Sequence, residues 1–307
     1  AATGAIGAAI LTTLAAFSRD DWHGYAAWIP LFLGGALMFA GAWLTADEVQ
    51  DSRKDRATGF WVGAGAALVL LGIESAFPAS VRTAAHAGAA AFFAFGFGMR
   101  GWTMLRYSAL VAAALAIGHA LSADLISATL RGVIPLGGAL ITLAVAAALL
   151  FIASALTNRA QPRELAAESL SAGGVFIILI GVFLALRAFV AGPDRDGIDS
   201  FTEISLRVIS AMAAGHILMT RPGQDVGLIG RWRHHVLLGA ALLYAFALPA
   251  FSANPWWGLA PAPIYGPPIL NTLLLAFAMP AALSLFAARR LYNHQRTAAR
   301  IYAVAGG

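Results

Sequence analysis

The chain has 307 residues, of which 60% are hydrophobic and only 11% are charged, with a formal net charge of +5. Soluble domains carry roughly a quarter charged residues, so this composition excludes a water-soluble globular protein and indicates an integral membrane protein. The basic residues are almost all arginines in short loops, which argues against nucleic-acid binding, and the absence of cysteine excludes disulfides and thiolate metal sites.

Ten apolar stretches follow one another along the chain, most of them close to the roughly 20 residues that a transmembrane helix needs. We predict helices because lipid offers no partner to an open backbone and the stretches lack the alternation of barrel strands. The predicted spans are 3–17, 25–45, 59–78, 84–99, 105–121, 132–156, 170–191, 201–219, 235–251 and 267–288. The fold class is therefore an all-α polytopic bundle, with 1–307 as a single transmembrane domain.

Both ends of the chain resemble cut ends. The first stretch is short and follows no methionine or basic region, and Ile301–Val304 resembles the start of another span. We interpret the chain as a fragment of a longer polytopic protein.

The charge of the loops alternates, which predicts an orientation. Loops 46–58, 100–104, 157–169, 220–234 and 289–300 and their edges hold 14 of the 20 basic residues, whereas the opposite loops hold only Arg19, Arg82, Arg131 and Arg195. Under the positive-inside rule the first set faces the cytoplasm. Both ends are then cytoplasmic, and we expect the inner membrane of a bacterium.

Two features of the spans predict their packing. Small residues recur at a spacing of four in 90–98 and 112–120, a pattern that allows close helix approach and that also arises by chance in an alanine-rich chain. Pro135 and Pro280 lie inside predicted spans and are expected to kink them.

Ionisable residues inside membrane spans are costly, so they are candidate functional residues. Most of those in this chain lie toward the predicted outer side of the bilayer, and His216 lies toward the inner side. The outer group consists of Glu74, His86, His119, Arg187, Glu203 and Arg207, with the polar Asn271 at a similar depth.

Glu203 and Arg207 are four residues apart and share a helix face, and Arg187 lies on the preceding span. Two arginines beside one glutamate predict a binding site for an anionic headgroup, carboxylate or phosphate, in which Asn271 adds a hydrogen bond. The alternative is a structural ion pair that holds two helices together.

His86 and His119 lie at similar depths on consecutive spans and are candidate ligands for a haem or a metal. Hydrogen-bonded interfacial histidines are the commoner alternative, so we assign no metal ion and leave the cofactor unknown. Glu74 is a candidate proton-relay carboxylate or a helix-end residue that contacts interfacial water.

Three loop features complete the candidates. Asp20 and Asp21 form an acidic pair of the kind that membrane glycosyltransferases use, or a solvated turn. The proline-rich segment after Asn254 is an interfacial aromatic belt or a lid. His234 and His235 stand beside Arg231 and Arg233, and we interpret them as interfacial cations.

The C-terminal part resembles a large family of bacterial predicted membrane proteins, domain of unknown function 2339. The resemblance covers roughly 165–290 and is carried by Leu186-Arg187, an acidic loop, Glu203–Leu206, Arg231-Trp232-Arg233, Asn254-Pro255, Pro268–Phe277 and Pro280-Ala281. It implies additional spans and an N-terminal extension, and it implies that Arg187, Glu203, Asn254 and Asn271 belong to a family pattern. It implies no reaction.

Together these features favour an envelope-related role: handling a lipid-linked or anionic substrate in the outer half of the bilayer, as a transporter or flippase-like component. The first alternative is a membrane-embedded transferase with an outer carboxylate as its base, and the second is a non-catalytic subunit of a larger membrane complex. The expected partners are membrane lipids, such a substrate and subunits of a membrane complex, without nucleic acid.

Overall fold

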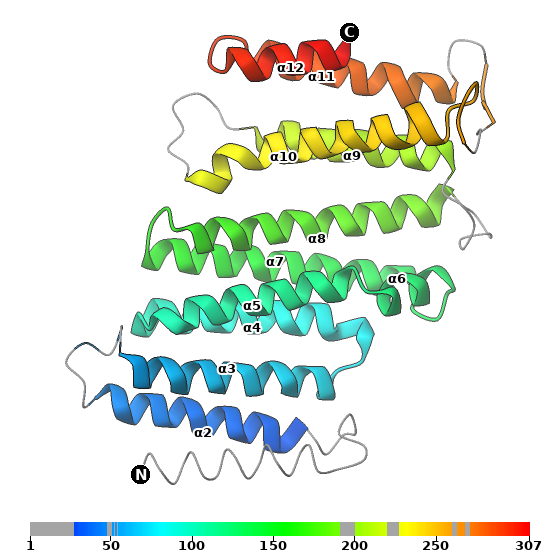
Figure 1. Cartoon of the computed structure of the whole chain (residues 1–307). Coiled ribbons are helices and arrows are strands. Elements are labelled where there is room, and N and C mark those ends of the chain that lie inside the picture. The colour runs from blue at the N-terminus through cyan, green and yellow to red at the C-terminus, as the bar shows by residue number, and fades with distance from the viewer. Residues whose placement is uncertain are drawn as a thin grey trace. The chain divides into compact units, whose positions relative to one another are not determined.

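The computed structural model describes residues 28–47, 51, 53, 55–190, 200–219, 227–259, 263–267 and 271–307. Throughout these residues the regular secondary structure is helical, without a β-strand. The chain divides into two compact units, Ala1–Ile180 and Gly181–Gly307, whose helices are labelled in Figure 1. The all-α prediction is confirmed for the described residues.

The helices of the first unit are α2 (Trp28–Ala46), α3 (Arg56–Ala76), α4 (Ala79–Arg100), α5 (Thr103–Ala120), α6 (Ala123–Leu130), α7 (Leu136–Ala160) and the first part of α8 (Leu165–Val190). The second unit contains the rest of α8, then α9 (Phe201–Leu218), α10 (Leu228–Ala245), the π-helical segments η1 (Phe246–Ser252) and η2 (Leu274–Ala278), α11 (Met279–Leu291) and α12 (Arg296–Gly306).

Within the described residues, seven segments are long and apolar enough to cross a membrane: Trp28–Ala46, Arg56–Ala76, Thr103–Leu130, Leu136–Ala160, Leu165–Val190, Leu228–Ser252 and Leu274–Leu291. The predicted spans at 84–99 and 201–219 are helices, α4 and α9, but both carry ionisable side chains and are not among the seven. The predicted span 3–17 lies outside the described residues. The count of ten spans and the cytoplasmic ends therefore stay predictions.

In the first unit α4 packs against both α5 and α7. Its buried stripe runs through His86, Ala90, Phe93, Ala94 and Phe97, the spacing of one helical face. The small residues predicted for close packing lie on such faces: Ala90 and Ala94 on α4 have no exposed surface, and neither do Ala112, Ala116 and Ala120 on α5. The interpretation as packing residues is confirmed for these alanines, whereas Gly98, the last residue of the pattern in 90–98, is exposed.

Short connections bring the ends of α3, α4 and α5 together. Only Phe77 and Pro78 separate α3 from α4, and α4 ends at Arg100 and is capped by Gly101, whose φ of +68° favours glycine. Neighbouring helices joined in this way run antiparallel. The last turns of α3 and α5 therefore lie beside the first turns of α4. At the opposite end of α3, the backbone N–H of Thr58 donates to the Asp55 carboxylate at 2.7 Å, which lowers the pKa of this N-cap residue.

The second unit is built on α9, α10, α11 and α12. Buried side chains from all four helices form its core, among them Met212, Leu238, Ala287 and Tyr302. The short helix α12 packs against α11, so Ile301–Val304 is part of an 11-residue helix in this structure. Whether a further span begins there stays a prediction.

The two intramembrane prolines have different outcomes. Pro280 lies in the first turn of α11, just after the π-helical segment η2, as expected for a helix distortion near proline. Pro135 does not kink a span, because α7 begins at Leu136 and Pro135 occupies its N-cap position. The prediction of a kink at Pro135 is wrong, since its missing N–H costs nothing before the first helical turn.

Candidate functional site

An ion-pair cluster lies at the start of α9. Glu203 has no exposed surface, and its carboxylate accepts a hydrogen bond from Arg187 Nη1 of α8 at 2.8 Å and another from Arg207 Nη2. Arg187 is itself only 5% exposed. The i,i+4 pairing of Glu203 with Arg207 and the approach of Arg187 from the preceding helix are both as predicted. The binding of an anionic group there stays a prediction.

Asn271 and Asn254 each hydrogen-bond to the backbone of their own segments. The Asn271 side-chain oxygen accepts from the Leu273 backbone N–H at 3.1 Å, immediately before η2. Asn254 is buried, donates to the Ala250 carbonyl at 3.2 Å and accepts from the Trp256 N–H at 2.9 Å. Both asparagines thus hold loop ends, and a hydrogen bond from Asn271 to a substrate stays a prediction.

A second polar cluster joins α3, α4 and α5 in the first unit. The Nε2 atoms of His86 and His119 lie 2.8 and 2.5 Å from the same carboxylate oxygen, Oε1 of Glu74. The two imidazole rings are stacked, with an interplanar angle of 2° and 5.2 Å between centroids. Arg82 Nε lies 3.7 Å from the other oxygen, Oε2. The predicted proximity of the histidines is confirmed. Glu74, which we predicted as a separate candidate, contacts both of them.

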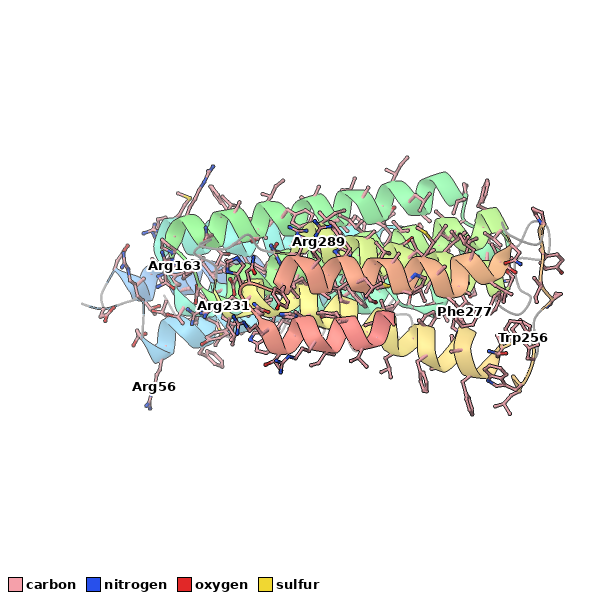
Figure 2. All side chains as sticks on the ribbon, turned by 90° about the horizontal axis from the view of Figure 1, so that it is seen from above. Arg56, Arg163, Arg231, Trp256, Phe277 and Arg289 are labelled. Atoms are coloured by element: carbon pink, nitrogen blue, oxygen red, sulfur yellow. The ribbon has the colours of Figure 1, made fainter. Side chains whose placement is uncertain are left out.

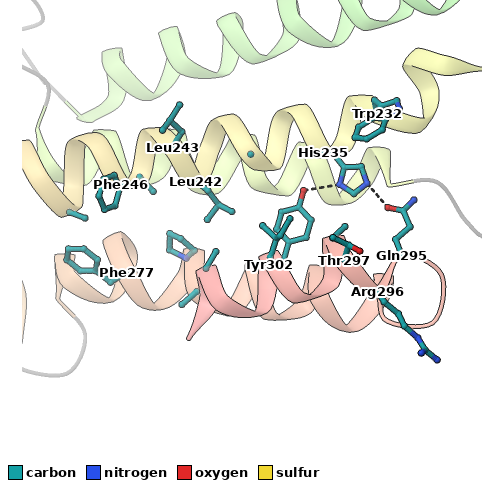
Figure 3. A pocket seen from close by; sticks show the side chains of 18 of the residues that line it. Trp232, His235, Leu242, Leu243, Phe246, Phe277, Gln295, Arg296, Thr297 and Tyr302 are labelled. Atoms are coloured by element: carbon teal, nitrogen blue, oxygen red, sulfur yellow. Dashed lines mark hydrogen bonds between the residues drawn. The ribbon is translucent and has the colours of Figure 1, made fainter.

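The described residues of the second unit enclose a groove that the sequence did not reveal. Its volume is about 1100 Å³, which exceeds the roughly 300–1,000 Å³ usual for small-molecule sites. Side chains of α10, η1, η2, α11 and α12 line it, and one stretch of the wall is almost entirely apolar, with Leu242, Phe246, Phe277 and Ile301 among its residues (Figure 3).

One end of this groove is polar. His235 on α10 contacts the Tyr302 hydroxyl at 3.0 Å through Nδ1 and the Gln295 side-chain oxygen at 2.6 Å through Nε2. Trp232 lies one turn before His235, and Arg296 begins α12 beside Gln295 (Figure 3). His235 therefore lines a groove rather than serving only as an interfacial cation. His234 is buried, at 1% exposed, so that interpretation is wrong for it.

The two ends of the second unit differ in character. Figure 2 shows Arg231 and Arg289 toward one end and Phe277 and Trp256 toward the other. The Phe277 ring lies 6.2 Å from that of Phe201, two residues before Glu203, so the Glu203 cluster is at the end away from the arginine-rich loops. This separation agrees with the depths predicted for these residues.

Two prolines of the sequence lie in or beside the irregular helical segments that line the groove, but neither alone predicts a groove. Pro249 interrupts η1 and Pro280 follows η2, and π-helical segments often occur at functional sites. The packing of α12 back onto α11, which completes the groove, has no comparable signal in the sequence. Asp20 and Asp21 lie outside the described residues, so their role stays a prediction.

Comparison with known proteins adds a family but no reaction. No curated protein and no solved structure matches the chain. The model of a family of predicted membrane proteins, domain of unknown function 2339, matches residues 1–307, beyond the 165–290 that carried the resemblance. The chain belongs to this family of predicted membrane proteins.

Proposed function

We propose that the chain handles an amphiphile with an anionic headgroup, such as a lipid or a lipid-linked substrate, as a transporter or flippase-like protein of the bacterial inner membrane. The groove of the second unit is the observation that carries this proposal. Its apolar wall suits an acyl or isoprenyl chain, and its polar end suits a headgroup.

The polar end favours an anionic headgroup. Arg296 and His235 belong to the groove, and Arg231 and Arg289 lie toward the same end of the unit. Tryptophan and arginine are the side chains expected where a lipid headgroup meets the bilayer interface. Trp232, next to Arg231, supplies such a ring at this position.

Movement of the amphiphile is supported by the helix irregularities in the groove wall. Phe246 and Ala250 belong to η1 and Ala276 and Phe277 belong to η2, so two π-helical segments line the end that lies away from Arg296. Their backbone hydrogen bonds already depart from the α-helical pattern. Pro280 removes one more hydrogen bond, because proline has no backbone N–H. In this proposal the segment around Pro280 moves when the amphiphile passes.

The predicted substrate-binding residues take a defined place in this proposal. Phe201 contacts Phe277 at the far end of the unit from Arg231, which places the nearby Glu203 cluster and Asn271 toward that end. There Arg187, Glu203, Arg207 and Asn271 would meet an anionic group that leaves the groove. The transferase alternative is less favoured for Glu203. Its carboxylate forms ion pairs with two arginines, which makes it poorly suited to accept a proton as a base. Further partners in a membrane complex remain compatible with the groove.

Gly239 offers a direct test of the groove. It lines the groove on α10, and a Cβ atom at this position would meet no atom within 4 Å. Gly239→Leu should fill the groove without disturbing the fold, because leucine favours a helix over glycine by up to about 1 kcal/mol. We expect it to weaken binding of phosphatidylglycerol by about tenfold, about 1.4 kcal/mol, measured with lipid-free chain in micelles.

The matched control is Gly98→Leu, because Gly98 also lies in a helix, α4, with no atom within 4 Å of its Cβ position. This control should bind phosphatidylglycerol as the unmodified chain does. Phosphatidylcholine and glycerol phosphate distinguish a need for the charge from a need for the acyl chain, and both should bind more weakly. Equal binding by the two glycine variants would exclude the groove as the binding site.

A further inference from the structure

We propose that Glu74, His86 and His119 form a binding site for a divalent transition-metal ion, with Zn²⁺ as the typical occupant. This site belongs to the first unit and is independent of the lipid groove. Its three ligand atoms, two imidazole nitrogens and a carboxylate oxygen, all lie within 4.8 Å of one another. Two histidines and one carboxylate form the ligand set of catalytic zinc sites and of non-haem iron sites.

The distances suit a metal ion after a small side-chain adjustment. Bonds of about 2.1 Å to a tetrahedral ion separate its ligand atoms by about 3.4 Å. The two Nε2–Oε1 distances here are 2.8 and 2.5 Å. A slight retreat of the Glu74 carboxyl group would therefore admit an ion between Oε1 and the two rings, which both already direct Nε2 at this point.

The surroundings of the cluster resemble those of a metal site that is closed on one side. His86 has no exposed surface, whereas the side chains of Glu74 and His119 are 25% and 21% exposed. The ion would thus be held by three protein ligands with a fourth position facing the open side, as in catalytic zinc sites. Arg82, 3.7 Å from Oε2, would orient the carboxylate from outside the ligand set.

Metal binding at this site would also require a partner for the far nitrogen of the His86 ring. Nδ1 of His86 is buried without a hydrogen-bond partner, which is uncommon in folded proteins. An ionised carboxylate only accepts, so each Nε2 that contacts it donates, and Nδ1 of a neutral His86 is then an acceptor. Metal binding at Nε2 would place the proton on Nδ1, and a metal-bound histidine usually donates that proton to a carbonyl, a carboxylate or a water molecule.

The chemistry of the ligands defines the class of ion. Imidazole nitrogen favours zinc, copper, iron and nickel, whereas magnesium and calcium prefer oxygen ligands. The site differs in this way from an acidic cluster, because two of its three ligands are nitrogens. We assigned no metal to these residues from the sequence. Glu74 becomes a third candidate ligand only because α3 packs against α4 and α5.

Zinc binding by the full chain in detergent micelles tests the proposal. We expect one Zn²⁺ per chain after removal of bound metal with a chelator and titration against a chromophoric competitor. Glu74→Gln, His86→Gln and His119→Gln should each weaken binding by at least about tenfold. Glu74→Gln preserves the shape of the side chain, so it tests the ligand even where a histidine variant fails to fold.

The matched control is His216→Gln, which alters a largely buried histidine of α9 whose Nε2 lies 3.0 Å from the Leu283 carbonyl. It should bind zinc as the unmodified chain does. Co²⁺ loaded into the unmodified chain should give the intense visible bands of a four-coordinate site. Absence of stoichiometric zinc, or equal binding by Glu74→Gln and the unmodified chain, would overturn the proposal and favour a proton-relay triad.

Discussion

Replacing Glu203 by alanine is expected to lower the free energy of unfolding by about 3–5 kcal/mol, the usual cost of removing one partner from a buried ion pair. The Glu203 carboxylate has no exposed surface and holds Arg187, which is itself 5% exposed, at 2.8 Å. The substitution removes the negative charge between two guanidinium groups in a region of low dielectric constant. Denaturation of the chain in detergent micelles measures the effect.

Two further variants show whether the loss of stability comes from the buried ion pair. The double variant R187M/E203M should recover part of the lost stability, because it removes the two most buried charges together and leaves only the more exposed Arg207 without Glu203. Asp124→Ala removes an exposed carboxylate in the first turn of α6 and should cost about 0.5 kcal/mol. A loss below about 1 kcal/mol for Glu203→Ala would show that the carboxylate does not hold the two arginines in the folded protein.

The same residues address the anion-site prediction. If Arg187 and Arg207 hold an anionic group that leaves the groove, the double variant E203Q/R207Q should bind phosphatidylglycerol more weakly, even where it folds. Unchanged lipid binding by this variant would assign the cluster a structural role only. Measuring both stability and lipid binding therefore distinguishes a structural role of the cluster from a role in substrate binding.

Replacing Gly65 by leucine is expected to cost about 3 kcal/mol, near the upper end of overpacking effects. A Cβ atom on Gly65 of α3 would lie 3.1 Å from the Gly35 carbonyl oxygen and 3.1 Å from Met38 Cβ of α2. The two helices approach through their backbones here, so the additional carbons of leucine can only be accommodated by moving α2 away from α3. The midpoint of thermal unfolding in micelles should fall accordingly.

A matched control lies on the same helix. Gly59 of α3 has no atom within 4 Å of its Cβ position, so Gly59→Leu should leave the midpoint unchanged or raise it slightly. A similar fall for both variants would mean that the Gly35–Gly65 contact does not determine the packing of α2 on α3. An unchanged unfolding midpoint for Gly65→Leu would contradict the close backbone contact between Gly35 and Gly65.

The elements of the fold were largely predictable, because long apolar stretches and arginine-rich loops directly reflect the bilayer. The predicted spans 84–99 and 201–219 form the helices α4 and α9, but His86 or Glu203 interrupts the apolar pattern there, and neither helix is among the seven candidate membrane spans. The predicted span 132–156 begins a few residues before α7, and Pro135 was therefore placed inside a span. Hydropathy does not locate the first turn of a helix, whereas the N-cap geometry does.

The candidate sites were predictable only where the contacts are local. Glu203 and Arg207 are one helical turn apart, so their pairing follows from the sequence. Glu74 contacts His119 across 45 residues, and His235 contacts Tyr302 across 67, so these contacts depend on how the helices pack. The groove likewise depends on the packing of α12 on α11, which a single sequence does not specify.

The most direct test of the central claim, that the groove holds an amphiphile, uses the absence of cysteine from the chain. A single cysteine at Leu242 lines the groove, whereas one at Phe92 of α4 lies on an exposed surface. A thiol-reactive phospholipid should label the Leu242→Cys chain to saturation, and excess phosphatidylglycerol should prevent this, while the Phe92→Cys chain reacts slowly and without competition. Equal labelling of both positions, unaffected by the competitor, would contradict the account.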